Sequence, residues 1–307
     1  ATPGARESQL PKGMLRILLI SFLTGVFGST VAAQDATPTS KPTPDHKSSQ
    51  SETDANRASN LIESIEANDL SKVWRLLEEG ANPDATGDDY RPALQYAVRQ
   101  GQSEIVEALL AHRAHVDAED DHGGSALQTA AGLGYANLVK LLIAHGADVN
   151  HSDHAGHTAL MCAAFGSTIE SAPAWLAAAI FELDEDDDLL GKMGSEHISV
   201  VKALLNAGAN VNAQGKDCGL TALMVAAIHG NVEMTKMLLE RKPDVQLTNG
   251  QSTALQFAEL IDSPEKLPEE LGEIEGEKRQ QAFLNWLHLT AAGRKEVVAL
   301  LRKAGAK

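Results

Sequence analysis

The sequence predicts an all-α solenoid of six helix-pair repeats, and three observations support this fold class. One stretch of 33 residues, 124–156, contains a small-residue helix, a glycine break and an apolar helix. A leucine column recurs at that period, and a second leucine column accompanies it. A unit this small cannot bury its own apolar face, so a stable protein must stack several copies.

The first 33 residues have the layout of a secretory signal peptide. Lys12 and Arg16 lie at the start of a largely apolar run, 15–27, and small residues ending at Ala33 follow it. This order predicts export to the periplasm or out of the cell, with cleavage after Ala33 and no membrane association afterwards. The alternative is a retained anchor, although the apolar run is shorter than the ~20 residues of a spanning helix.

Residues 34–57 are rich in Pro, Ser, Thr, Asp and Lys, and Ala is their only apolar type. Such a composition cannot bury enough surface to offset the entropy lost on ordering. We therefore expect a disordered linker here, followed by the repeat domain at 58–307.

From Ala58 onward the copies align on the two leucine columns. In copies four and six, the valines that follow the first leucine stand 41 and 43 residues after it, although the spacing in copies one to three is twelve. These two copies therefore carry insertions, at about 167–195 and 260–289. The first column is Leu61, Leu94, Leu127, Leu160, Leu223 and Leu255, and the second is Leu76, Leu109, Leu142, Leu204, Leu238 and Leu301.

The terminal copies carry charged residues where the inner copies are apolar. Lys72 replaces an aliphatic residue of the second helix in copy one, and Arg302 does so in copy six. A finite stack needs polar outer faces to stay soluble, so these substitutions fit the ends of a solenoid.

Several segments resemble ankyrin repeats. They are 156–164 (GHTALMCAA) and 220–227 (LTALMVAA), together with 146–150 (GADVN) and 208–212 (GANVN). The chain departs from the family pattern where Ala replaces the usual Pro after Thr, and where Gln or Met replaces the usual His. The family's His ties the turn by hydrogen bonds, so its loss implies a weaker turn. The replaced positions are Ala159, Ala222 and Ala254, and Gln95, Gln128, Met161, Met224 and Gln256.

This resemblance implies a curved stack of antiparallel helix pairs with hairpin-like fingers along one edge. Members of the family mostly bind other proteins through finger tips and the concave face of the first helices, and are rarely catalysts. The expected contact residues are therefore Asp121, His122, His154, Asp217 and Asn249 on the fingers, and Leu133, Phe165 and His229 on the concave face. Asp120 and Asp153, at the head of their turns, are expected to cap backbone amides instead.

Charge, composition and the motifs that the sequence lacks argue against two classes of function, nucleic-acid binding and catalysis. The formal net charge of −16 repels phosphate backbones, which argues against nucleic-acid binding. Aromatic residues make up only 4% of the chain, which argues against a large aromatic-lined active site. No phosphate-binding glycine loop, Gly-x-Ser-x-Gly elbow or His-Glu-x-x-His pair occurs in the sequence. We predict a non-enzymatic, cofactor-free monomer that binds a protein of unknown identity.

Two other functions remain open from the sequence. A group of histidines lies near the third finger, and zinc accepts imidazole and carboxylate ligands, so metal binding or a metal-dependent activity shared with the insertions is one alternative. The repeat geometry spreads these residues, and His157 falls in a variable slot of the repeat, so we expect hydrogen-bonded or solvated histidines. An inhibitor or immunity-type protein is the other alternative. The group is His112, His145, His151, His154 and His157.

The two cysteines occupy different environments in the repeat. Cys162 stands in a helix slot filled by Tyr96, Thr129, Val225 and Phe257 in other copies, whereas Cys218 stands in a polar turn. A disulfide requires Cα atoms within about 7 Å, so we expect a buried and an exposed thiol without a bond between them.

Both insertions are predicted to contain helix and to leave the stack opposite the fingers. Pro173 opens an apolar run in the first, and Ser263 with Pro264 gives a helix start in the second, whose apolar end should lengthen the last helix. We expect the aromatic residues of both insertions to form a satellite core, with a docking patch as the alternative. These residues are Trp175, Phe181, Phe283 and Trp286.

Overall fold

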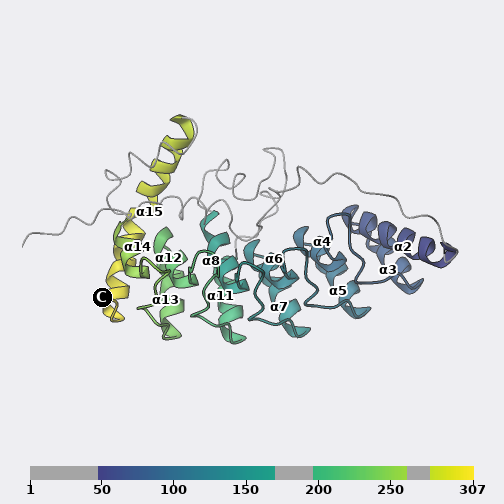
Figure 1. The fold of residues 1–307 in the computed structure, drawn as a ribbon, viewed down its shortest axis with the longest axis horizontal. Helices are drawn as coiled ribbons and strands as arrows, with labels where there is room; N and C mark the ends of the chain where they lie inside the picture. Colours follow the sequence, from purple (N-terminus) through teal and green to yellow (C-terminus); the bar gives the residue numbers. More distant parts are fainter. Residues whose placement is uncertain (1–47, 170–195, 261–276) are drawn as a thin grey trace, which may run out of the picture.

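The computed structural model describes residues 48–169, 196–260 and 277–307, and within these ranges it is an all-α solenoid (Figure 1). Twelve helices follow one another in them, and isolated bridges are the only β pairing among the described residues. The predicted fold class is confirmed. The first helices are α2 (Ser48–Glu66), α4 (Ala93–Arg99), α6 (Ala126–Gly132), α8 (Ala159–Ile169), α12 (Ala222–His229) and α14 (Ala254–Leu260). The second helices are α3 (Leu70–Glu78), α5 (Ser103–Ala111), α7 (Ala136–Ala144), α11 (His197–Asn206), α13 (Val232–Glu240) and α15 (Glu277–Lys303).

Each first helix packs against the second helix that follows it, and each pair packs against the next. Figure 1 shows the two resulting rows, with α4, α6, α8 and α12 in one and α5, α7, α11 and α13 in the other. Neighbours within a row are in contact, as for α6 with α8 and for α5 with α7. Every described helix pair is therefore stabilised by its neighbours.

The core runs continuously through the stack. Every leucine of both columns is buried, from Leu61 at one end to Leu301 at the other, and all belong to one hydrophobic cluster. Burying one leucine side chain stabilises a fold by roughly 1.5–3 kcal/mol, so the twelve column positions hold the repeats together.

Helix α2 begins at Ser48, inside the segment 34–57 that was expected to be a linker. Residues 48–57 are therefore helical, although their composition predicted disorder. Once a helix has nucleated on packed residues such as Leu61 and Ile65, extending it by another turn costs little free energy, even for a polar sequence. The expected signal peptide and the remaining linker lie outside the described residues.

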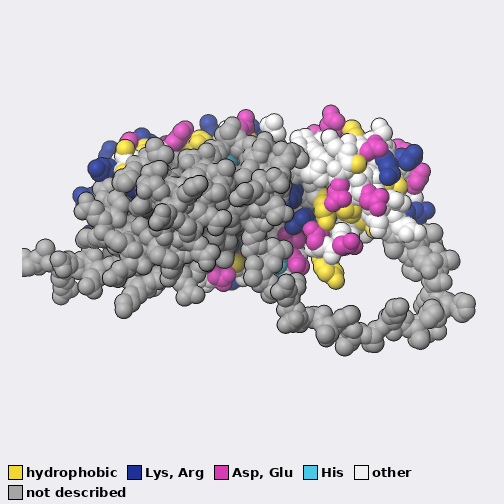
Figure 2. Space-filling model, turned by 90° about the horizontal axis from the view of Figure 1, so that it is seen from above, with side chains coloured by type: hydrophobic (Ala, Val, Ile, Leu, Met, Phe, Trp, Pro, Cys, Tyr) yellow, Lys and Arg dark blue, Asp and Glu magenta, His cyan; other side chains and the backbone are white. Residues whose placement is uncertain are grey.

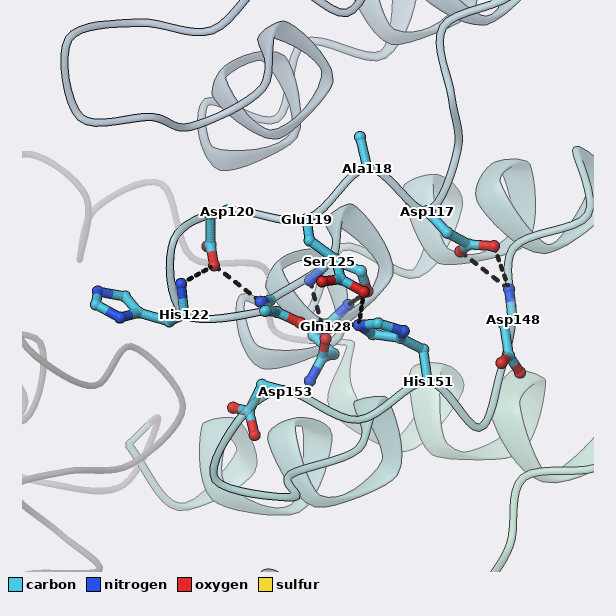
Figure 3. Close-up of polar contacts among 12 residues, drawn as sticks. Asp117, Ala118, Glu119, Asp120, His122, Ser125, Gln128, Asp148, His151 and Asp153 are labelled. Carbon is cyan, nitrogen blue, oxygen red and sulfur yellow. Dashed lines mark hydrogen bonds and ion pairs between the residues drawn. The ribbon is translucent and has the colours of Figure 1, made fainter.

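Side chains in the loops after the second helices link each repeat to the next. Asp117 accepts hydrogen bonds from the backbone N–H of Asp148 at 3.0 and 3.2 Å, as Figure 3 shows. Asn150 accepts from the N–H of Asn210 at 2.7 Å, which carries the connection across the first insertion. Equivalent bonds join Asp84 to His115 and Asn212 to Asp244, and Gln246 donates to the Gly305 carbonyl oxygen.

Glutamine supplies the turn hydrogen bonds that the missing histidine would make. The Gln95 side chain donates to the carbonyl oxygens of Ala118 and Gly124, at 3.1 and 2.7 Å. The Gln128 side chain donates to the His157 carbonyl oxygen at 2.8 Å and accepts from the Ser125 N–H at 2.9 Å. The weaker turn implied by these substitutions is thus not found at Gln95 and Gln128, because an amide both donates and accepts.

Most of both insertions, including Trp175 and Phe181, lies outside the described residues, as do the side chains of Phe283 and Trp286. Helix α15 has 27 residues where α13 has 9, so the last helix is lengthened as expected. It projects beyond the stack in Figure 1.

No helix within the described ranges is both long enough and apolar enough to cross a membrane. Figure 2 shows acidic and basic side chains interspersed on the part of one face that is not grey.

Candidate partner-binding surface

A row of hairpin-like loops, which we call the finger row, follows the second helices. Three of the loops are closed by isolated antiparallel bridges, Thr86 with Pro92, Ser152 with Thr158, and Thr248 with Thr253. The tips of the five fingers are residues 87–91, 120–124, 153–157, 215–219 and 248–252.

Asp and Asn side chains at the start of the turns hold the finger tips in shape. Asp120 Oδ1 accepts from the N–H groups of His122 and Gly124, at 3.0 and 2.8 Å (Figure 3). Asp153 Oδ1 accepts from the N–H of His157 at 2.7 Å. The predicted capping by both aspartates is confirmed, and Asn249 caps the fifth finger in the same way.

Neighbouring fingers are also bonded to each other. The His154 N–H donates to the His122 carbonyl oxygen at 2.9 Å, and the Lys216 N–H donates to the Ala155 carbonyl oxygen at 2.6 Å. Gly156, at φ +81°, permits this approach, because a Cβ there would lie 2.7 Å from the Lys216 nitrogen. Backbone bonds therefore connect the second, third and fourth fingers directly.

All five candidates on the fingers reach solvent. Asp121, His154 and Asp217 are exposed, and His122 and Asn249 are partly exposed. The His122 Nε2 lies 3.2 Å from a carboxylate oxygen of Asp121. The row thus presents short polar side chains on a backbone that is already ordered.

The first finger carries a contact candidate that the sequence reading missed. Tyr90 is 71% exposed, at φ 59°, and beside it Asp89 forms an ion pair with Arg91 at 2.9 Å. The Tyr96 hydroxyl donates to Asp89, and Arg91 lies over the Tyr96 ring. Burial works against ionisation of Asp89, but the Tyr96 hydroxyl and Arg91 hold its pKa below the usual value. The sequence signal that could have identified Tyr90 was an aromatic residue inside a polar turn.

The three candidates on the first helices are not on the surface. Leu133 is 0% exposed, and Phe165 and His229 are each 8% exposed. The ends of these helices pack closely, since a Cβ on Gly166 would collide with the Gly132 carbonyl oxygen, to which His197 also bonds at 3.0 Å. These side chains fill the space between repeats and offer a partner almost no surface.

The histidine group is spread along the stack, and two of its five members are bonded to backbone carbonyl oxygens. His112 pairs with the Ala108 carbonyl oxygen at 2.9 Å, and His151 with that of Gly123 at 2.8 Å. His145 and His154 are exposed. Across 48–169, 196–260 and 277–307, no three His, Cys, Asp or Glu residues are grouped so that they could hold a metal ion.

His157 is buried in a polar cluster with Asp153 and Cys218. Its Nδ1 lies 3.2 Å from Asp153 Oδ2, and its Cδ2 and the Cys218 sulfur border the same small space beside Gly215. Burial alone would lower the pKa of His157, but the hydrogen bonds and charges of Asp153 and Cys218 raise it to about 9. Burial likewise opposes ionisation of Asp153, and the His157 contact holds its pKa below the usual value.

Both cysteines are free, Cys162 buried and Cys218 partly exposed, as predicted. Burial, with the nearby Asp153 charge, raises the pKa of the Cys162 thiol well above its usual value.

His229 has the opposite electrostatic environment from His157. Its Nδ1 faces the Val225 carbonyl oxygen at 2.8 Å within α12. Burial lowers its pKa to about 4, and the positive charge of Arg294 on α15 adds to this effect. His229 is therefore neutral near pH 7.

Comparison with known proteins points to one family. A model described as "Ankyrin repeats (3 copies)" matches residues 61–153 and 115–176, and one described as "Ankyrin repeats (many copies)" matches 192–239. A segment of 68 residues is 40% identical to part of an ankyrin repeat and KH domain-containing protein of Caenorhabditis briggsae. The aligned segment is 22% of this chain and 2% of that relative, so the chain spans only a small part of the relative's length.

Proposed function

Because this chain is built from ankyrin repeats, which indicate a protein-protein interaction module, we propose that it binds a protein partner through the finger row. The main support for the proposal is that the finger row has a fixed conformation. Its exposed tips are held by side-chain caps and by backbone bonds from one finger to the next. A surface ordered before binding loses little conformational entropy when a partner docks.

The chemistry of the row suggests the partner's surface. Asp88, Asp89, Asp121 and Asp217 are exposed along it, against Lys216 and the partly exposed Arg91. We infer a partner face with Lys or Arg side chains opposite the aspartates. Tyr90, at the first finger, is the expected anchor, since exposed tyrosines are enriched among residues that dominate binding energy.

Site-specific photo-crosslinking tests this surface. A photoreactive amino acid at position 154, on the third finger, should capture one partner in cells that make the protein. Position 202, on the exposed side of α11, is the matched control and should capture none. Equal capture at both positions, or capture at 202 alone, would place the binding surface elsewhere.

Once the partner is known, its affinity for Tyr90→Ala can be measured. We expect a loss of at least about tenfold, in the range of a truncated aromatic anchor. Lys140→Ala on α7, which is also exposed, should bind like the wild type. A Tyr90→Ala affinity within twofold of wild type would remove Tyr90 from the interface.

We also propose that the protein is exported. The support is the charged, apolar and small-residue order of residues 12–33. Mass spectrometry of the protein from its native cells should give a mature N terminus at Gln34. A chain that still contains residues 15–27 would contradict cleavage and favour a retained anchor.

A further inference from the structure

The fourth finger brings a thiol, an imidazole and a carboxylate together from both sides of the first insertion. Asp153 and His157 belong to the third finger, and Cys218 belongs to the fourth. A Cβ built on Gly215 would lie 3.1 Å from the Cys218 sulfur and 3.5 Å from His157 Cδ2, so the sulfur and the ring border the same small space. The carboxylate, the ring and the thiol are thus gathered at one place between the third and fourth fingers.

The contacts assign a role to each nitrogen of the ring. Nδ1 faces Asp153 Oδ2 at 3.2 Å, and Asp153 is itself fixed by the bond from the His157 N–H to its Oδ1 at 2.7 Å. Nε2, which is bonded to Cδ2, is the ring nitrogen left on the side of the Cys218 sulfur. A carboxylate that accepts a hydrogen bond from Nδ1–H makes Nε2 a better proton acceptor, and a thiol that gives its proton to such an imidazole reacts as the thiolate.

We propose that Cys218 is a nucleophilic thiol that is modified by peroxides, with His157 as its acid-base partner and Asp153 as the positioning residue. Nothing in the partner-binding function requires this site, so the two proposals stand independently.

The reaction is a two-electron oxidation of sulfur. The Cys218 thiolate attacks the terminal oxygen of a hydroperoxide ROOH, so that a sulfur-oxygen bond forms as the oxygen-oxygen bond breaks. The departing alkoxide, or hydroxide for hydrogen peroxide, takes the Nε2 proton of His157 and leaves as ROH. The product is the sulfenic acid of Cys218, the first and reversible step of cysteine oxidation.

Solvent exposure distinguishes the Cys218 thiol from the Cys162 thiol. Cys218 is partly exposed at a finger turn, so a small oxidant can reach it, whereas Cys162 is 0% exposed within α8. The charged residues next to Cys218 in its turn are Lys216 and Asp217, both exposed to solvent. The Phe165 ring lies nearly perpendicular to the His157 ring, at 6.4 Å between centroids. Cys162 is the internal control for any measurement on Cys218.

Alkylation of the full chain by iodoacetamide, followed peptide by peptide in mass spectrometry, tests the pairing. If His157 assists Cys218 as proposed, the Cys218 rate should fall less steeply from about pH 8 to about pH 6 than that of an ordinary thiol, which slows about tenfold per pH unit. His157→Asn should lower the Cys218 rate at pH 6.5 by at least about tenfold and restore the ordinary pH dependence. Hydrogen peroxide with dimedone should label Cys218 of the wild type, and the label should fall in the same variant.

Asp153→Asn and Asp120→Asn form the control pair. Both aspartates cap their own finger, but only Asp153 faces a histidine, since Gly124 occupies the place of His157 in the second finger. Asp153→Asn should shift the pH profile of Cys218, and Asp120→Asn should leave it unchanged. A wild-type rate that already falls tenfold per pH unit would overturn the proposal without any variant. Equal rates in wild type and in a folded His157→Asn or Asp153→Asn variant would overturn it as well.

Discussion

Buried glutamine side chains form hydrogen bonds between neighbouring repeats. Gln95 and Gln128 reach from one repeat to the backbone of the next, and both are almost fully buried. A buried amide left without its hydrogen bonds costs roughly 1–3 kcal/mol, which is comparable with one core leucine. These glutamines therefore contribute to the order of the fingers as well as to stability.

Gln128→Ala should lower the free energy of unfolding by about 1–3 kcal/mol, because the buried Ser125 N–H loses its acceptor. Gln256 makes the equivalent bond to the Thr253 N–H, but its own side chain is exposed. Gln256→Ala should therefore cost less, since water can replace the amide. Urea denaturation of both variants measures the difference, and equal losses would show that burial of the amide is irrelevant.

His229 should make the protein sensitive to acid. Its folded pKa of about 4 lies below the unfolded value of 6.5, so the stability of the neutral, buried ring is complete above pH 6.5. That stability is lost as the pH falls from 6.5 toward 4, with a total on the order of 3 kcal/mol. His229→Gln should show a smaller drop in melting temperature between pH 7 and pH 5 than the wild type. His145→Gln, at an exposed position, should fall as the wild type does, and a His229→Gln drop equal to that of the wild type would contradict the assignment.

His157 should produce the opposite dependence. Its folded pKa of about 9 lies above 6.5, so its contribution is complete below pH 6.5 and is lost as the pH rises through 9. The melting temperature of the wild type should therefore fall between pH 7 and pH 10 by more than that of a His157→Asn variant. An identical fall in both proteins would mean that the contact with Asp153 adds no stability.

The sequence predicted the core positions that recur in every repeat. It did not predict the contacts between neighbouring repeats. The leucine columns recur at a fixed period, so Leu61 and its counterparts were identifiable as core. Cys218 lies opposite His157 only because the stack places the fourth finger against the third, and nothing local to either residue records that contact. Leu133 and His229 were expected on the surface but are buried, because the ends of the first helices pack more closely than the family pattern alone reveals.

The bounds of α15 and α2 show the same difference between local sequence signals and packing with distant residues. The apolar end of the second insertion correctly indicated a longer last helix, since helical periodicity can be read locally. The polar sequence from Ser48 gave no such signal, because its helix extends one that is held by residues after Ala58. Composition thus predicted a linker where packing further along the chain sustains a helix.

The contact between α12 and α15 depends on Gly230. This residue ends α12 at φ 65°, and a Cβ there would lie 2.7 Å from both the Arg294 nitrogen and the Thr290 carbonyl oxygen. Those are backbone atoms of α15, so the helix would have to move. The last helix can therefore pack on the stack only while this position is glycine.

Gly230→Ala should destabilise the C-terminal end of the stack by more than about 2 kcal/mol, the sum of left-handed strain and the collision. Gly250 also has positive φ, at +91°, but nothing lies within 4 Å of its Cβ position. Gly250→Ala should therefore cost only the strain, about 1–2 kcal/mol. Hydrogen exchange of the α15 amides distinguishes the two variants. Faster exchange in Gly250→Ala than in Gly230→Ala would refute the close contact.

Across the whole molecule, the finger row is ordered by hydrogen bonds between repeats, which supports our proposal that this edge binds another protein. The side-chain bonds from Asp84 to Gln246 align the repeats, and the backbone bonds from His122 to Lys216 align three finger tips. The regular positions behind this order were readable from the sequence as a family pattern. The exposed Tyr90 and the buried Phe165 were not, because exposure depends on the packing of the assembled stack.

The most direct test of a partner-binding finger row is a pair of charge reversals. Asp217→Lys changes an exposed finger tip, and Glu240→Lys changes an equally acidic, exposed residue at the end of α13. Affinity for the captured partner, measured by calorimetry, should fall by at least about tenfold for Asp217→Lys, since a like charge opposes the partner's basic face, and should be unchanged for Glu240→Lys. Equal affinities for the two variants, or a loss confined to Glu240→Lys, would contradict binding through the fingers.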